Sequence, residues 1–166
     1  MTNEEEKSAP VEVFRSDYTP LPYTVSNICM DVDITDGKTT VRSSLSFQSN
    51  PKYSGEDSTE IVLDGDECVS LISLEMNRSA LKEGVDYKLS PGKLTLLPAA
   101  FSSNGDNVLS TVVEIVPEAN TQLSGSYKSG PMYGSQYEVM EIRRSTYYPD
   151  RPDVMAVFEK VRITIE

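Results

Sequence analysis

The sequence predicts an all-β fold, and three observations support this prediction. Apolar and polar residues alternate at a period of two in several short segments, as they do in half-buried strands. Turn-forming pairs such as Asp36-Gly37 and Pro91-Gly92 separate those segments. No long window carries apolar residues at the i, i+3, i+4, i+7 spacing of an amphipathic helix. We therefore expect an antiparallel sandwich or a saddle-shaped sheet within one domain.

The first half of the chain contains the clearest hairpin. Residues 1–10 are acidic and end in proline, so we expect a disordered tail followed by a β-domain over residues 11–166. The predicted hairpin turns at Asp36-Gly37, a pair that supplies positive φ. Its two strands would bury alternating apolar residues: Ile28, Met30, Val32 and Ile34 before the turn, and Val41, Leu45 and Phe47 after it.

The second half continues this pattern with one exception. Further strands are predicted at residues 60–63, 69–76, 87–89, 94–97, 108–116 and 157–165. The exception is a short helical turn near Asp150-Met155, because Pro152 suits a first helical position and Asp153 suits a helix N-terminus.

Composition excludes several classes of function. The 166 residues include no histidine, so the chain alone cannot supply a Ser-His-Asp or Cys-His nucleophile, and no metal site is predicted. The net charge of −11 makes DNA, RNA and anionic membranes unsuitable partners. The N-terminus lacks the apolar core of a signal peptide. We expect a cytoplasmic protein, or an organellar one after removal of a transit segment, with Cys29 and Cys68 reduced and separately buried.

Three motifs after residue 117 resemble one known family. They are Asn120-Thr121-x-Leu123-x-Gly125-x-Tyr127-x-Ser129-Gly130, Gln136-x-Glu138, and Thr146-Tyr147-Tyr148-x-Asp150-Arg151-Pro152-Asp153. Together they resemble the N-terminal β-domain of the aminopeptidase N family of zinc metallopeptidases, which includes alanyl aminopeptidases and the leukotriene-A hydrolase. The resemblance extends upstream to Asp17-Tyr18 and Pro22-Tyr23, and so covers nearly all of the chain after the tail.

The resemblance implies a role in substrate binding. In this family a loop of the β-domain reaches the active site of a separate catalytic domain, and its glutamine and glutamate bind the N-terminal residue of the peptide. The matching positions are Gln136 and Glu138. A carboxylate can hold an ammonium group by a charge-assisted hydrogen bond. The family's HExxH and GAMEN motifs are absent, so we expect no catalytic residue and no cofactor here, with zinc held by the missing domain.

Two departures from the family pattern affect these expectations. Bulkier residues fill the small positions of the loop Gly134–Ser145, and Ser145 replaces an apolar residue, which suggests a surface that faces water. The chain also ends at Glu166, where the family's β-domain continues with further strands. We therefore expect a C-terminally truncated domain whose open sheet edge can pair with another copy.

Two functional hypotheses follow. The first is a non-catalytic domain or fragment that partners the catalytic domain of an aminopeptidase and contacts peptide N-termini only in the complete enzyme. The alternative is a stand-alone or engineered β-sheet module that binds another protein, because five of nine tyrosines lie between residues 127 and 148. The predicted interface residues are Tyr133, Tyr137, Tyr147 and Tyr148.

Overall fold

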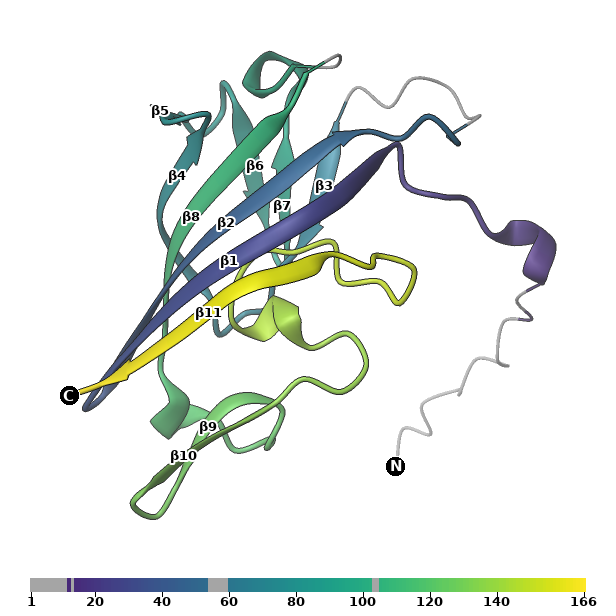
Figure 1. Cartoon of the computed structure of the whole chain (residues 1–166). Helices are drawn as coiled ribbons and strands as arrows, with labels where there is room; N and C mark the ends of the chain where they lie inside the picture. Colours follow the sequence, from purple (N-terminus) through teal and green to yellow (C-terminus); the bar gives the residue numbers. More distant parts are fainter. Residues whose placement is uncertain (1–11, 13, 54–59, 103–104) are drawn as a thin grey trace, which may run out of the picture.

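The computed structural model describes residue 12 and residues 14–53, 60–102 and 105–166. These residues form sheets of six, three and two strands (Figure 1). Among them the only helices are short 3₁₀ turns, so the all-β prediction is confirmed. In this part of the chain no helix has the length and apolar character needed to cross a membrane. The predicted tail, residues 1–10, lies outside the described residues.

The six-stranded sheet has the order β11-β1-β2-β8-β4-β5. Its central hairpin forms as predicted, with β1 and β2 antiparallel around Asp36-Gly37 and with Gly37 at φ 78°. A left-handed residue at this position is what a tight hairpin turn requires. The strands are β1 (Tyr23–Thr35), β2 (Lys38–Ser49), β4 (Ser70–Met76), β5 (Ser79–Ala80), β8 (Asn107–Ile115) and β11 (Val157–Ile165).

A three-stranded sheet forms the second layer, behind the first in Figure 1. It consists of β3 (Ile61–Asp64), β6 (Tyr87–Ser90) and β7 (Lys93–Leu96), in the order β3-β7-β6. Leu63, Leu94 and Leu96 from this sheet are fully buried in one apolar cluster with residues of the large sheet. Because burial of a leucine side chain stabilises a fold by about 1.5–3 kcal/mol, this inter-sheet core is the main source of stability.

Three buried hydroxyl groups tie the segment after residue 145 to the large sheet. Ser43 Oγ on β2 lies 2.6 Å from Thr111 Oγ1 on β8 and 2.8 Å from Thr146 Oγ1. The two threonine oxygens are 3.0 Å apart. Two residues further on, Tyr148 exchanges backbone hydrogen bonds with Asp64, at 2.8 and 3.0 Å. These contacts fix the C-terminal end of the loop that carries the candidate site.

The structure corrects three expectations. β11 runs parallel to β1, because the connection between residues 116 and 156 brings the chain back in the same direction. The segment Asp150-Met155 contains a simple turn, in which the Val154 N–H donates to the Arg151 carbonyl, and the nearest helical turn is η4 (Ile142–Arg144). Cys29 and Cys68 are unpaired, but Cys68 is exposed and Cys29 is only half-buried.

Candidate functional site

Gln136 and Glu138 lie at the end of a small hairpin beside the β1–β2 turn (Figure 1). This hairpin is the two-stranded sheet, β9 (Gly125–Ser129) and β10 (Met132–Gln136). Gln136 is the last residue of β10 and Glu138 begins the loop to η4. Both side chains are exposed, and the Gln136 Nε2 lies 3.5 Å from the Glu138 Oε2. The structure therefore places the amide and the carboxylate side by side and open to solvent.

Tyr137 anchors this part of the loop from between the two candidate residues. Its hydroxyl lies 2.9 Å from Ser126 Oγ on β9 and 2.8 Å from Ser145 Oγ just after η4. Ser145 is 1% exposed, so the expectation that it marks a surface facing water is wrong. The serine hydroxyl is satisfied in the interior by Tyr137, which explains how a polar residue occupies a buried position.

A second anchor holds the other end of the hairpin. The Tyr133 hydroxyl donates to Glu118 Oε1 at 2.7 Å, and the Lys128 ammonium contacts Glu118 at 3.2 Å and Asp36 at 2.8 Å. The hydrogen bond from Tyr133 is the main cause that lowers the pKa of Glu118 to about 2. The carboxylate stays ionised and links the hairpin to the β1–β2 turn.

Arg144 on η4 packs against the start of the β9–β10 hairpin. Its guanidinium donates to Gln122 Oε1 at 2.8 Å and contacts Asp66 Oδ2 at 3.3 Å. The arginine side chain packs directly over Gly125, where an added Cβ would lie 2.7 Å from the Cβ of Arg144. Gly125 also has φ 72°, so this position requires glycine both for its backbone and for the close approach.

The predicted interface tyrosines separate into two pairs. Tyr133 is half-buried and Tyr137 is exposed, both on the hairpin side of the molecule. Tyr147 and Tyr148 belong to the apolar core, and a Cβ at Gly65 would lie 2.5 Å from the Tyr147 ring. The prediction that Tyr147 and Tyr148 are interface residues is therefore corrected, because the core between the two sheets already covers both rings.

An apolar groove lies between the hairpin and the edge of the large sheet. It encloses about 390 Å³, and the sequence analysis did not identify it. Val161, Ile163 and Ile165 of β11 form one wall, and Tyr127 and Tyr133 contribute to the hairpin side. The alternation along residues 161–165 indicated an apolar strand face, but the hairpin that completes the groove was not predicted.

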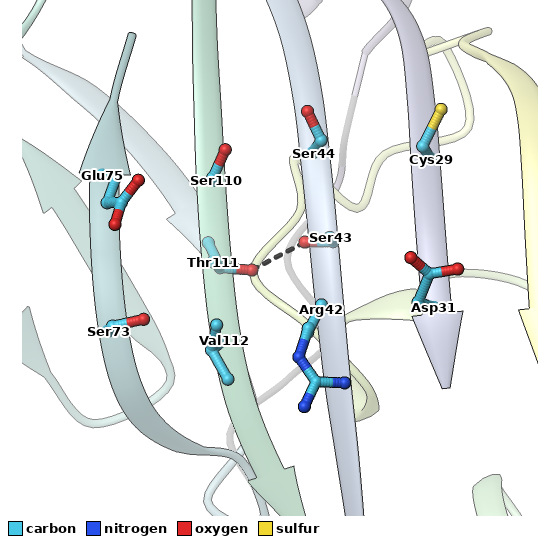
Figure 2. A pocket seen from close by; sticks show the side chains of 10 residues that line it. All are labelled: Cys29, Asp31, Arg42, Ser43, Ser44, Ser73, Glu75, Ser110, Thr111 and Val112. Carbon is cyan, nitrogen blue, oxygen red and sulfur yellow. Dashed lines mark hydrogen bonds between the residues drawn. The ribbon is translucent and has the colours of Figure 1, made fainter. Parts of the chain in front are cut away.

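A more open hollow of about 270 Å³ lies on the large sheet and is lined mainly by residues with polar side chains (Figure 2). Two of its charged side chains already form ion pairs, Asp31 with Arg162 and Arg42 with Asp33. The remaining lining is mostly hydroxyl groups, so it offers no concentrated charge to a ligand. The lining residues are Cys29, Asp31, Arg42, Ser43, Ser44, Ser73, Glu75, Ser110, Thr111 and Val112.

The residues that the structure describes do not fit a zinc ion. Among the described residues no group of three or more His, Cys, Asp or Glu side chains is placed to hold a metal. The sequence contains no histidine, and so it contains no HExxH motif.

Solved structures that share this fold include metallopeptidases of the M1 class and an aminopeptidase A. The M1 zinc metallopeptidase of Deinococcus radiodurans superposes with a TM-score of 0.69 at 15% identity, over 89% of this chain and 33% of that protein. Aminopeptidase A of Legionella pneumophila gives a TM-score of 0.77 at 28% identity, over 88% of this chain and 16% of that protein.

Sequence comparison finds relatives that carry the name aminopeptidase N. The chain is 34% identical to aminopeptidase N of Caulobacter vibrioides over 156 residues, and 32% identical to that of Escherichia coli over 151 residues. These matches cover 93% and 90% of this chain but only 17% and 16% of the relatives. No protein-family model matches the chain. The chain is therefore homologous to a domain-sized portion of aminopeptidase N.

Proposed function

We propose that this chain is the N-terminal β-domain of an aminopeptidase N-like zinc peptidase, and that Gln136 and Glu138 bind the α-amine of the peptide substrate. The observation that carries the proposal is the exposed pair at the end of the anchored hairpin, in a chain homologous to aminopeptidase N. The Legionella neighbour was solved in complex with aspartic acid, a molecule that has a free α-amine.

The chemistry of the pair suits this role. An ammonium group offers three donors, and an exposed carboxylate accepts such donors in charge-assisted hydrogen bonds. Gln136 adds a carbonyl oxygen as a second acceptor, while its amide nitrogen lies 3.5 Å from Glu138 and restrains the carboxylate. The site accepts only a free α-amine, which in a peptide belongs to the first residue. A peptide bound in this way is therefore shortened by one residue in each round of hydrolysis. Bond cleavage belongs to the metal-bearing part of the complete enzyme.

The experiment places this chain in a complete enzyme. The segment of the E. coli aminopeptidase N that matches this chain is replaced by the chain, and hydrolysis of alanyl p-nitroanilide is measured. Glu138→Gln and Gln136→Ala should each lower kcat/KM by about tenfold to a hundredfold, because a hydrogen bond to a charged group contributes about 1.5–3 kcal/mol.

Glu141→Gln is the matched control, since it removes the same charge from the same loop. It should leave kcat/KM within about twofold of the unmodified chimera. Equal losses in Glu138→Gln and Glu141→Gln would show that loop charge, and not a specific amine contact, determines activity. An active chimera that tolerates Glu138→Gln would refute the proposed role.

A further inference from the structure

Tyr137 lies between the two candidate residues but points to the opposite side of the chain. Gln136 ends β10, and its Nε2 lies 3.5 Å from the Glu138 Oε2 two residues further on. These two side chains share one side of the chain, because side chains alternate along an extended segment. On the other side the Tyr137 hydroxyl lies 2.9 Å from Ser126 Oγ and 2.8 Å from Ser145 Oγ. A fixed Tyr137 therefore fixes the side from which the amide and the carboxylate project.

The two serines fasten Tyr137 to separate parts of the fold. Ser126 belongs to β9, the partner strand of β10 in the hairpin. Ser145 is buried and is followed directly by Thr146, whose fully buried hydroxyl is bonded to β2 and β8 of the large sheet. One phenol hydroxyl thus joins the candidate site both to the hairpin and to the core.

The three hydroxyl groups form a closed set. Ser126 Oγ and Ser145 Oγ are 3.4 Å apart, which is longer than either contact with Tyr137. A hydroxyl has one donor and can also accept, so each of the three can donate to one neighbour and accept from the other. Without the phenol hydroxyl the serines keep only their longer contact, and a buried hydroxyl that lacks a good partner is unfavourable. The fold therefore favours the conformation in which Tyr137 is bonded.

The backbone after Glu138 makes this contact important for the position of the carboxylate. Val139 and Met140 have φ values of 50° and 65°, left-handed conformations that residues with a Cβ rarely adopt. Such conformations persist only where the surrounding contacts hold them. Because Glu138 lies between this pair and Tyr137, its position depends on whether the tyrosine stays bonded.

We propose that Tyr137 is a positioning residue for amine binding: its hydroxyl, held by Ser126 and Ser145, keeps the Glu138 carboxylate at the place where the α-amine binds. This inference rests on the proposed function, because the position of Glu138 affects catalysis only if Glu138 binds the amine. Tyr137 acts through Glu138 by increasing the fraction of time during which the carboxylate is in place.

The test uses the chimera with E. coli aminopeptidase N and two substrates, alanyl p-nitroanilide and its propionyl analogue, which lacks the amine. The ratio of their kcat/KM values measures the preference for the amine. Tyr137→Phe keeps the ring but removes the hydroxyl, and it should lower this ratio by about threefold to tenfold. A loss of folded enzyme would lower both kcat/KM values equally and leave the ratio unchanged.

Tyr127→Phe is the matched control. It also removes a phenol hydroxyl from the hairpin, on β9, but this hydroxyl has no hydrogen-bond partner among the residues that the structure describes. The substitution should change the ratio by less than about twofold. An equal fall of the ratio in Tyr127→Phe and Tyr137→Phe would overturn the specific role of Tyr137.

A double-substitution cycle tests whether Tyr137 acts through Glu138. Tyr137→Phe should lower the ratio no further in a Glu138→Gln background, because no carboxylate is left to position. Equal effects in the two backgrounds, or a ratio that falls in Glu138→Gln but not in Tyr137→Phe, would overturn this inference and leave the proposed function standing. A ratio that does not fall in Glu138→Gln would refute the proposed function, and this inference with it.

A second measurement needs no peptidase activity. ¹⁵N relaxation of the 166-residue chain should give the Glu138 N–H an order parameter of about 0.85, typical of rigid backbone. Tyr137→Phe should lower this order parameter below about 0.6, whereas Tyr127→Phe should leave it unchanged. An unchanged order parameter in Tyr137→Phe would overturn the positioning role, whatever the result for amine binding.

Discussion

Val139 and Met140 adopt left-handed backbone conformations directly after Glu138, with φ values of 50° and 65°. This region is unfavourable for residues with a Cβ, and most of all for a β-branched residue such as valine. Strain of this kind costs on the order of 1–3 kcal/mol per residue and is held by the surrounding contacts. Here those contacts are the Tyr137 hydrogen bonds to Ser126 and Ser145 on either side of the loop.

Glycine should relieve the strain at residue 139. We expect Val139→Gly to be more stable than Val116→Gly by about 1–3 kcal/mol in urea unfolding. Val116 is also an exposed valine, but its φ of −121° is unstrained, so both variants gain the same unfolded-state entropy. Equal destabilisation by the two substitutions would contradict the strained conformation at Val139.

Thr146 should contribute to stability through its buried hydroxyl group. Thr146→Val keeps the side-chain shape but removes the hydrogen bonds to Ser43 and Thr111, and it should lower the free energy of unfolding by about 1–3 kcal/mol. Thr24→Val, an exposed position on β1, is the control and should change it by less than about 0.5 kcal/mol. Similar unfolding midpoints for the two variants would show that the hydroxyl cluster is unimportant.

Sequence reasoning found the residues of the candidate site but not their surroundings. Gln136 and Glu138 were identifiable because a motif carries them. Nothing local to Tyr147 or Ser145 indicates burial, since that depends on the distant contacts with Gly65 and with the hydroxyl of Tyr137. Burial of polar or aromatic residues in a loop is a tertiary property that the alternation of neighbouring residues does not encode.

At the scale of elements, the β9–β10 hairpin positions the candidate site, and the anchor at Glu118 depends on pH. The folded-state pKa of Glu118 is lowered from 4.5 to about 2, chiefly by the hydrogen bond from Tyr133. A carboxyl group whose pKa is lower in the folded state than in the unfolded state stabilises the folded state at pH values above its unfolded-state pKa. For Glu118 this stabilisation is lost as the pH falls from 4.5 toward 2.

Tyr133→Phe should raise the pKa of Glu118 toward its ordinary value and weaken the dependence of stability on pH in that window. The measurement is the carboxyl-carbon NMR titration of Glu118, together with thermal unfolding at several acidic pH values. Tyr87→Phe, on β6 of the other sheet, should leave the Glu118 titration unchanged. A native Glu118 that titrates near 4.5 would contradict the anchor.

The predicted strands carry a local pattern of alternating apolar and polar residues, whereas the strands that were not predicted lack such a pattern or depend on distant parts of the chain. The β1–β2 hairpin was predicted because Ile28 and Met30 alternate with polar residues and Asp36-Gly37 suits a tight turn. The structure confirms it, since both apolar side chains are buried and Gly37 has a positive φ. The β9–β10 hairpin was not, because Gly125–Ser129 and Met132–Gln136 have few β-branched or apolar residues. The parallel direction of β11 also went unpredicted, since it depends on the path of some forty intervening residues.

At the scale of the whole molecule, the chain is homologous to a domain-sized portion of much longer relatives, of which it spans 17% and 16%. The two-sheet core accounts for its stability, whereas side chains at the end of the β9–β10 hairpin are exposed to solvent. The net charge of −11 agrees with the exclusion of nucleic acid but does not identify a partner.

The purified chain should not hydrolyse peptides. We expect no turnover of alanyl p-nitroanilide above background, with or without added zinc, because no described cluster of residues can hold the metal. The same assay on E. coli aminopeptidase N is the positive control. Turnover that copurifies with the chain and persists through further chromatography would contradict a non-catalytic domain.

The most direct test of the central claim compares substrates with and without an α-amine. In the chimera with E. coli aminopeptidase N, kcat/KM is measured for alanyl p-nitroanilide and for its propionyl analogue, which lacks only the amine. The account predicts a strong preference for the amine that Glu138→Gln reduces by about tenfold to a hundredfold, while Glu141→Gln leaves it unchanged. A preference that survives Glu138→Gln would contradict the role of this domain in amine recognition.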